Sequence, residues 1–284
     1  MVVDSNFLER PELRDYLAAS KKHFVVLTDY AAMEAYKQDA LNSIARRMAI
    51  ACEFPEQILV LHGTQIACGL TGSASDIAEC AIDPEQTAEF PKFCRALNLA
   101  QSGNQAVQAQ IIENSKEAGA HLARMLVDAE GIADGFADVA ASFTPVELKI
   151  LRQTDVPYPN ELLEKMARQI MELAALLMSD HPAVTSFPPP QEAPDRFIFR
   201  VATAGLVLAT RWIAVGGAHL AKPVKLRNDQ VDINFAAFAT YYDGLFTADK
   251  RLASIHGETK LWLDHVFSRR VENSVPTKSS DRQT

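Results

Sequence analysis

Short apolar runs alternate with amphipathic stretches over the first 70 residues. Three of the runs are rich in β-branched residues: 1–3, 23–27 and 58–61. They have the length and composition of buried strands. Helical spacing predicts a helix over 11–20 and a longer one that begins at a cap in 28–29 and ends at Pro55. Strands that alternate with helices in this way predict a parallel sheet.

From about residue 73 to residue 216 the pattern is almost entirely helical. It is clearest over three segments: 104–129, 160–179 and 196–215. The last of these is apolar on most faces, but Arg200 and Arg211 interrupt it, which predicts a core helix rather than a membrane span. We therefore expect a large helical insertion and no membrane contact.

The alternating pattern returns after residue 216. Asn228 or Asp229 can cap a helix, and 244–247 predicts a strand that ends at Asp249. Two further helices are expected after it, the second over about 258–269. The predicted organisation is an α/β core formed by 1–72 and 217–270, a helical insertion over 73–216, and a disordered tail over 271–284.

Composition limits the classes of protein that fit. The 284 residues are 48% hydrophobic and 23% charged, as in ordinary globular proteins, and the N-terminus lacks the basic leader of a signal peptide. The four cysteines contain no C-x-x-C pair, so we expect free thiols and a cytoplasmic protein. A net charge of -8 argues against binding nucleic acid through bulk positive charge but permits a local basic patch.

Four acidic residues occupy related places in the predicted sheet. Asp4 and Asp249 end strands, Glu34 lies in the opening turns of the helix after the second strand, and Asp232 lies in the first turn of the late helix. Functional groups gather beyond the carboxyl ends of parallel strands, so these carboxylates should converge. They would repel one another unless a cation neutralised them, and a hard cation such as Mg²⁺ or Mn²⁺ suits oxygen ligands.

The segments around these residues resemble, in order, the four acidic motifs of the PIN-domain nucleases. They read VVDSNFL, VVLTDYAAMEAYK, NDQVDINFAAFA and GLFTADKRL and lie in roughly the first 70 and last 65 residues. The resemblance implies a Rossmann-like α/β/α fold of the PIN type and metal-dependent cleavage of RNA or sometimes DNA. It implies catalytic, metal-binding carboxylates at four positions: Asp4, Glu34, Asp232 and Asp249.

Further residues join these four as candidates. Asn6 and Thr247 would support Asp4 and Asp249 and contact substrate. Asp243 is a fifth acidic neighbour, and Asp229 is an alternative metal ligand to Asp232, one helical turn away. Four basic residues could meet phosphates: Lys222, Lys225, Arg227 and Lys250. The first three equally fit a solvated loop, and Lys250 could instead pair with Asp249.

The sequence therefore predicts a phosphodiesterase that cleaves nucleic acid, RNA in preference to DNA, with water activated by Mg²⁺ or Mn²⁺. A haloacid-dehalogenase-type phosphatase is one alternative, although that mechanism needs a second aspartate where this chain has Asn6. A catalytically silent PIN-like module is the other. It would use the helical insertion to bind a partner protein, and the insertion could also join two copies of the chain.

Overall fold

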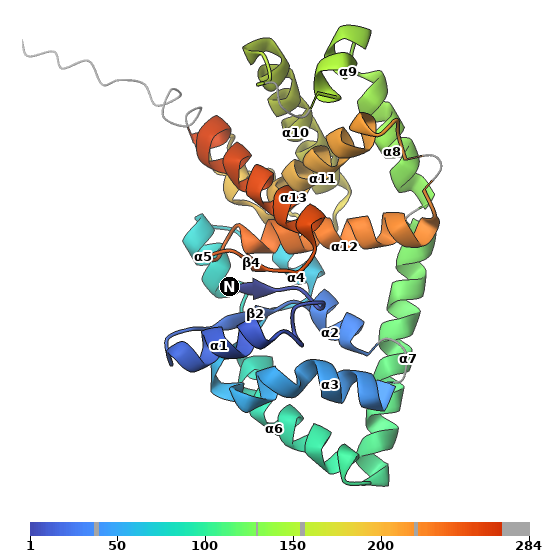
Figure 1. The fold of residues 1–284 in the computed structure, drawn as a ribbon. Coiled ribbons are helices and arrows are strands. Elements are labelled where there is room, and N and C mark those ends of the chain that lie inside the picture. The colour runs from blue at the N-terminus through green and yellow to red at the C-terminus, as the bar shows by residue number, and fades with distance from the viewer. Residues whose placement is uncertain (37–39, 129, 154–156, 219–220, 269–284) are drawn as a thin grey trace, which may run out of the picture.

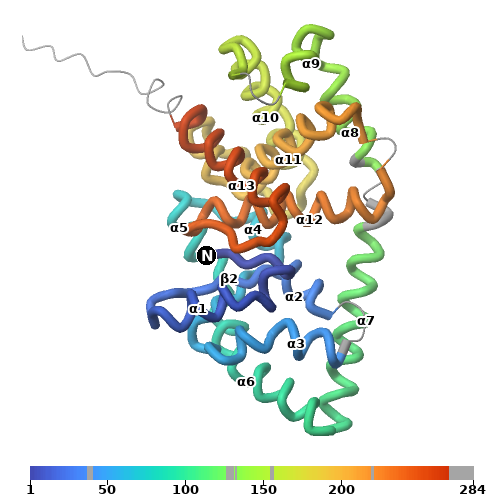
Figure 2. The backbone as a smooth tube through the Cα atoms, in the orientation of Figure 1, coloured from blue at the N-terminus to red at the C-terminus, as the bar shows by residue number. Residues whose placement is uncertain are grey.

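The computed structural model describes residues 1–36, 40–128, 130–153, 157–218 and 221–268. It is an α/β structure in which a small parallel sheet is surrounded by many helices (Figures 1 and 2). The tail predicted to be disordered, 271–284, lies outside the described residues.

The sheet has four short parallel strands in the order β3-β2-β1-β4. They are β1 (Val2–Val3), β2 (Val25–Leu27), β3 (Ile58–Val60) and β4 (Leu245–Phe246). The prediction of a parallel sheet built from these runs is confirmed. Because β2 and β3 lie on one side of β1 and β4 lies on the other, the strand order reverses at β1 and creates the kind of crevice where α/β proteins bind ligands.

Helices cover both faces of the sheet. In Figure 1, α1 (Pro11–Ala19), α3 (Ala40–Glu53) and α6 (Pro84–Gln101) lie below it, and α12 (Pro223–Ala239) and α13 (Lys250–Leu261) lie above it. The α12 helix packs directly on β1 and β4. The remaining α-helices are α2 (Asp29–Ala35), α4 (Thr64–Gly69), α5 (Ala74–Cys80), α7 (Gln105–Asp128), α8 (Glu130–Ala141), α9 (Pro145–Leu151), α10 (Asn160–Asp180) and α11 (Phe197–Ala214).

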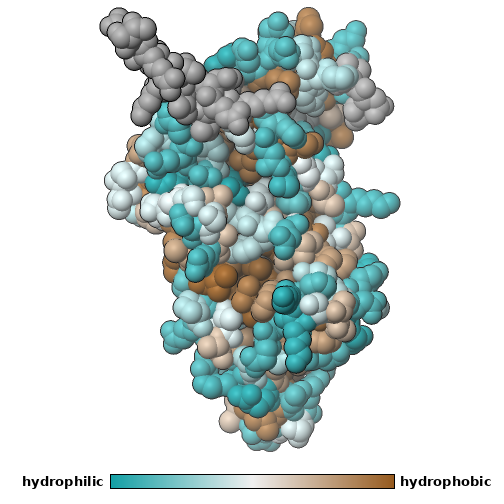
Figure 3. All heavy atoms as spheres, turned by 90° about the vertical axis from the view of Figure 1, so that its left-hand side faces the viewer, coloured by the Kyte–Doolittle hydropathy of each residue, from teal (hydrophilic) through white to brown (hydrophobic). Residues whose placement is uncertain are grey.

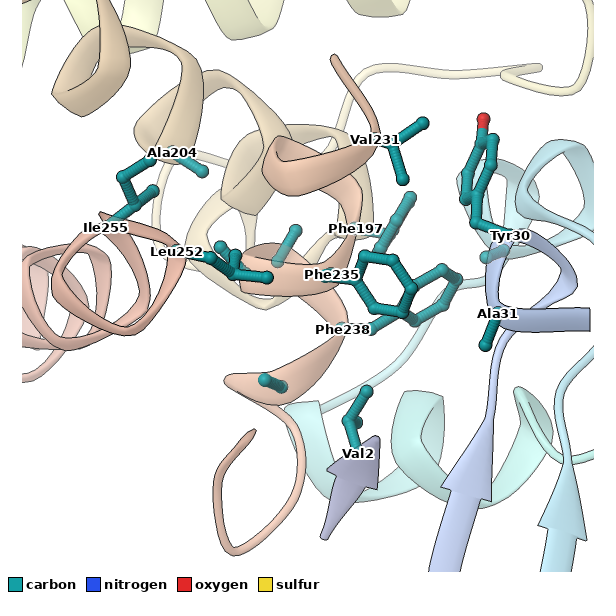
Figure 4. Close-up of a cluster of buried hydrophobic side chains, with 14 of the residues drawn as sticks. Val2, Tyr30, Ala31, Phe197, Ala204, Val231, Phe235, Phe238, Leu252 and Ile255 are labelled. Atoms are coloured by element: carbon teal, nitrogen blue, oxygen red, sulfur yellow. The ribbon is translucent and has the colours of Figure 1, made fainter. Parts of the chain in front are cut away.

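The helical segment 73–216 shares one hydrophobic core with the sheet and its helices. Its longest apolar helix, α11, packs against α12 and α13, and the rings of Phe197 and Phe238 lie 4.2 Å apart (Figure 4). By length and composition α11 could cross a membrane, but 78% of it is buried inside the molecule. It is therefore a core helix of the structure, as its sequence pattern predicts.

The long α7 helix connects the lower and upper layers. It contacts α2, α3 and α6 below and α8 and α12 above. The β1 arrow in Figure 1 points toward the side of the molecule on which α7 lies, so α7 stands beyond the carboxyl edge of the sheet. The side seen in Figure 3 carries a band of hydrophobic residues between more hydrophilic regions.

Three predictions of where helices begin or end differ from the structure. The single helix expected from 28–29 to Pro55 is two helices, since α2 ends at Ala35, where the Tyr36 N–H bonds back to the Met33 carbonyl, and α3 begins at residue 40. The expected cap at Asn228 or Asp229 is wrong because α12 begins five residues earlier, at Pro223. The two helices expected after residue 249 are one, because α13 continues without a break into a π-helical turn over Trp262–Phe267.

The prediction that all cysteines are free thiols is also wrong. Cys52 on α3 and Cys94 on α6 form a disulfide, with their Cα atoms 5.3 Å apart. The two helices pack against each other and bring together cysteines that are 42 residues apart in sequence. Cys68 and Cys80 are free.

Candidate active site

Asp4 is a buried carboxylate at the carboxyl end of β1. Its backbone N–H continues the pairing with β4 by donating to the Phe246 carbonyl at 2.9 Å, and the residue is only 5% exposed. The Thr247 hydroxyl donates to Oδ2 of Asp4 at 2.7 Å. Burial raises the pKa of Asp4 above its ordinary value, and the nearby Glu34 charge raises it further, whereas the Thr247 bond opposes the shift. The charge of Asp4 is thus met by a neutral hydroxyl.

Glu34 is connected to Asp4 through Ser5. The Ser5 hydroxyl lies 2.5 Å from Oε2 of Glu34 and 3.4 Å from Oδ1 of Asp4. Glu34 occupies the last turn of the short α2 helix rather than the opening of a long one. The Arg47 side chain donates to the Glu34 backbone carbonyl at 2.6 Å and fixes that turn.

The turn after β4 fastens the end of that strand to the end of β1. The Asp249 N–H donates to the Thr247 hydroxyl at 3.0 Å, and the Ala248 N–H donates to Oδ1 of Asn6 at 2.9 Å. Asp249 then caps α13, with its Oδ1 accepting from the N–H of Arg251 at 2.7 Å. Asn6 and Thr247 therefore hold the Asp4 and Asp249 segments together.

Asp232 projects from the middle of α12, not from its first turn as the sequence predicts. Burial is the main cause that raises its pKa, which reaches about 8. Three neighbouring carboxylates raise it further: Asp4, Asp249 and Asp229. The Arg251 guanidinium opposes them only in part. The structure thus brings Asp232 within electrostatic reach of both strand-end aspartates.

Asp229 lies on the same side of α12 but has a different environment. It is 1% exposed, and the Arg251 guanidinium donates to Oδ1 at 2.6 Å and to Oδ2 at 3.2 Å. The Trp212 indole N–H also donates to Oδ2, at 2.8 Å. Both oxygens of Asp229 therefore have protein donors, which favours Asp232 over Asp229 as the ligand for a cation.

The expectation that Asp243 joins the acidic cluster is wrong. Its charge acts on the Met1 ammonium and on the Tyr16 hydroxyl, groups at the amino edge of the sheet. Asp243 precedes β4, whereas Asp249 follows it. The two aspartates therefore lie at opposite ends of the same strand.

The basic residues expected to form a loop belong to α12. Lys222 is its N-cap residue, the Lys225 ammonium lies 4.5 Å from the centre of the Trp212 ring, and Arg227 donates to Asn228 at 2.8 Å. Lys250 is the exposed first residue of α13, directly after Asp249. Arg251, two positions after Asp249, is a basic residue of the site that the sequence pattern did not single out, and its guanidinium acts on Asp232.

The cluster formed by Asp4, Glu34, Asp232 and Asp249 is hereafter called the acidic cluster. Carboxylate oxygens are the ligands that Mg²⁺ and Mn²⁺ prefer, and the mutual repulsion that raises the pKa of Asp232 is what a bound cation would relieve. The donor chemistry therefore fits a hard divalent cation. No group of three or more His, Cys, Asp or Glu side chains in the described part of the chain is already arranged to hold a metal ion.

No family model, curated protein or solved structure matches this chain. The candidate site is therefore defined by its geometry and chemistry.

Proposed function

We propose that the protein is a PIN-like metal-dependent nuclease that cleaves RNA in preference to DNA. The observation that carries the proposal is the acidic cluster at the reversal of strand order, where burial and, after it, repulsion from neighbouring carboxylates raise the pKa of Asp232 to about 8. Asp4 is buried and Asp232 is partly buried, and like charges clustered in this way destabilise a fold, an effect that a bound cation would remove.

The residues of the acidic cluster have separable roles in this proposal. Asp4, Asp232 and Asp249 hold the cation, and Glu34 holds a second ion or orients the attacking water. When bound, the cation supplies positive charge that activates water and offsets the charge of the scissile phosphate. Thr247 and Ser5 fix the orientation of Asp4.

Asn6 supports a nuclease over a haloacid-dehalogenase-type phosphatase. The phosphatase mechanism needs a carboxylic acid at this position to donate a proton to the leaving group. Here the side-chain carbonyl of Asn6 accepts a hydrogen bond from the Ala248 N–H at 2.9 Å and holds the β4 turn. An amide in that structural role is not a general acid.

The decisive experiment is incubation of the purified protein with labelled single-stranded RNA and DNA, in Mn²⁺, in Mg²⁺ or in a chelator. We expect cleavage that needs the cation and is faster on RNA. Asp4→Asn should abolish it, because the amide keeps the Thr247 bond but loses the charge. Asp243→Asn is the matched control, since this aspartate lies at the amino edge, and it should cleave normally.

Cation binding can be measured separately from cleavage. A cation at a hundredfold excess over its dissociation constant should stabilise the folded protein by about 2.7 kcal/mol, seen as a higher melting temperature, and Glu34→Gln should reduce that shift. Identical melting curves in chelator and in Mn²⁺, together with uncut RNA, would refute the proposal.

A further inference from the structure

A cleft of about 820 Å³ lies beside the carboxyl ends of β2 and β3. Its residues come from α2, α4 and the turn before it, α7, α12 and the position after α10. A volume of this size is within the range of small-molecule binding sites in proteins. None of the residues of the acidic cluster lines the cleft.

The floor of the cleft is held rigidly by Asp29 and Thr64. Oδ2 of Asp29 accepts from the Thr64 N–H at 2.9 Å and from its hydroxyl at 3.1 Å, and Oδ1 accepts from the Tyr30 N–H at 2.9 Å. These bonds fasten the start of α2 to the start of α4. A cleft with such a floor is preformed and needs little rearrangement to bind a ligand.

The wall formed by α7 is basic. Arg124 and His121 lie one turn apart, with a guanidinium nitrogen 3.5 Å from Nδ1 of His121, and His181 also lines the cleft. Among the side chains that the structure describes, no carboxylate lies at ion-pair distance from Arg124. An arginine in this state is a suitable partner for a phosphate.

A polar atom in the cleft also lacks a partner. Gln230 of α12 lines the cleft, and its side-chain carbonyl oxygen is buried without a hydrogen bond from any described residue. A buried acceptor without a hydrogen bond is unfavourable, and a ligand that donates one would satisfy it. The exocyclic amino group of a nucleobase is such a donor.

Two helices contribute to both the cleft and the acidic cluster. The α2 helix supplies Tyr30 to the cleft and Glu34 to the cluster, and α12 supplies Gln230 to the cleft and Asp232 to the cluster. The two sites therefore share the carboxyl edge of the sheet. The acidic cluster has an excess of negative charge, whereas the cleft has an arginine on its α7 wall.

We propose that this cleft binds a nucleotide of the single-stranded substrate next to the scissile phosphate, with Arg124 on its phosphate and Gln230 on its base. This inference rests on the proposed nuclease function. It assigns a role to the helical segment between the two halves of the α/β core, because α7 forms the basic wall and so gives an acidic protein a local site for an acidic polymer.

The test measures binding separately from cleavage. A short fluorescein-labelled single-stranded RNA is titrated by anisotropy against the Asp249→Asn protein in Mg²⁺, at several KCl concentrations. Adding Arg124→Ala should weaken binding about tenfold and reduce the salt slope by about 0.7, the loss of one phosphate contact. Arg95→Ala, which removes an exposed arginine of α6 outside the cleft, is the control and should change neither quantity.

The two proposals fail in different ways. If Arg124→Ala binds RNA as tightly as Arg95→Ala does while the unmodified protein still cleaves RNA, the cleft inference is overturned and the nuclease stands. If binding depends on Arg124 but the unmodified protein cleaves nothing, the nuclease fails and the cleft remains a nucleic-acid site. In an active background, Arg124→Ala should raise KM and leave kcat nearly unchanged.

Discussion

Asp229, which is buried, and Asp232, which is partly buried, show two ways in which one helix carries an aspartate. They lie one turn apart on α12, and each is close to Arg251. Asp229 takes both donors of that guanidinium and the Trp212 indole N–H, so its charge is matched by the protein. Asp232 faces Asp4 and Asp249, and Arg251 offsets their effect only in part.

The difference separates a structural carboxylate from a functional one. An aspartate with a complete set of protein partners stabilises the packing of α11, α12 and α13. An aspartate whose neighbours are other carboxylates reduces stability until something positive binds, and such perturbed groups gather at functional sites. The same substitution, aspartate to asparagine, should therefore have opposite effects at the two positions.

The largest effect is expected at Asp249, one of the carboxylates close to Asp232. Asn caps helices as well as Asp does, so Asp249→Asn should keep the start of α13 intact and leave the melting temperature nearly unchanged. Cleavage of RNA should fall more than about a hundredfold, because even residues outside the first coordination shell of a metal cost 10–100-fold when changed. The measurement is kcat/KM in Mn²⁺. Normal cleavage by a folded Asp249→Asn protein would remove this residue from the site.

The second effect concerns Asp229, the aspartate whose charge is paired with Arg251. Asp229→Asn loses the ion pair with Arg251 while it can still accept from Trp212. We expect the free energy of unfolding to fall by about 2 kcal/mol, a typical value for charge-assisted hydrogen bonds. The expected loss is smaller than the cost of breaking a fully buried ion pair because the Arg251 side chain is 31% exposed. Urea unfolding measures it, and an unchanged midpoint would show that the pair contributes little.

The third effect has the opposite sign and depends on pH. With a pKa of about 8 against an ordinary 3.8, folded Asp232 keeps a proton that the unfolded chain releases, so stability falls as pH rises from about 4 to 8. In chelator, Asp232→Asn should remove this loss of stability. Its free energy of unfolding at pH 8 should exceed that of the unmodified protein by more than about 1.4 kcal/mol, the value of one pKa unit. Parallel stability curves for the two proteins from pH 5 to pH 8 would contradict a raised pKa.

The sequence predicts those features of the fold that depend on local pattern. The β-branched runs are strands, and Thr28 caps α2 through the Ala31 N–H at 3.1 Å, as predicted. Pro223, which suits the first position of a helix, begins α12, so Asp232 lies in the middle of the helix and not in its first turn. The predicted cap at Asn228 or Asp229 is therefore wrong.

The candidate site is predictable only where it follows strand ends. Asp4 and Asp249 could be placed because the carboxyl ends of parallel strands share an edge. The Cys52–Cys94 disulfide, the pairing of Asp229 with Arg251 and the position of α7 at the cleft depend on tertiary packing between distant segments. No spacing in the sequence encodes them.

The bond between Thr247 and Asp4 joins residues 243 positions apart, and it has a consequence for when the protein can act. Because β4 completes the sheet beside β1, Asp4 cannot meet Thr247 until the ribosome has added the residues that separate them. At about 5–20 residues per second, that interval is roughly 12 to 50 seconds. The acidic cluster is therefore assembled only after the helices between β3 and β4 have been made.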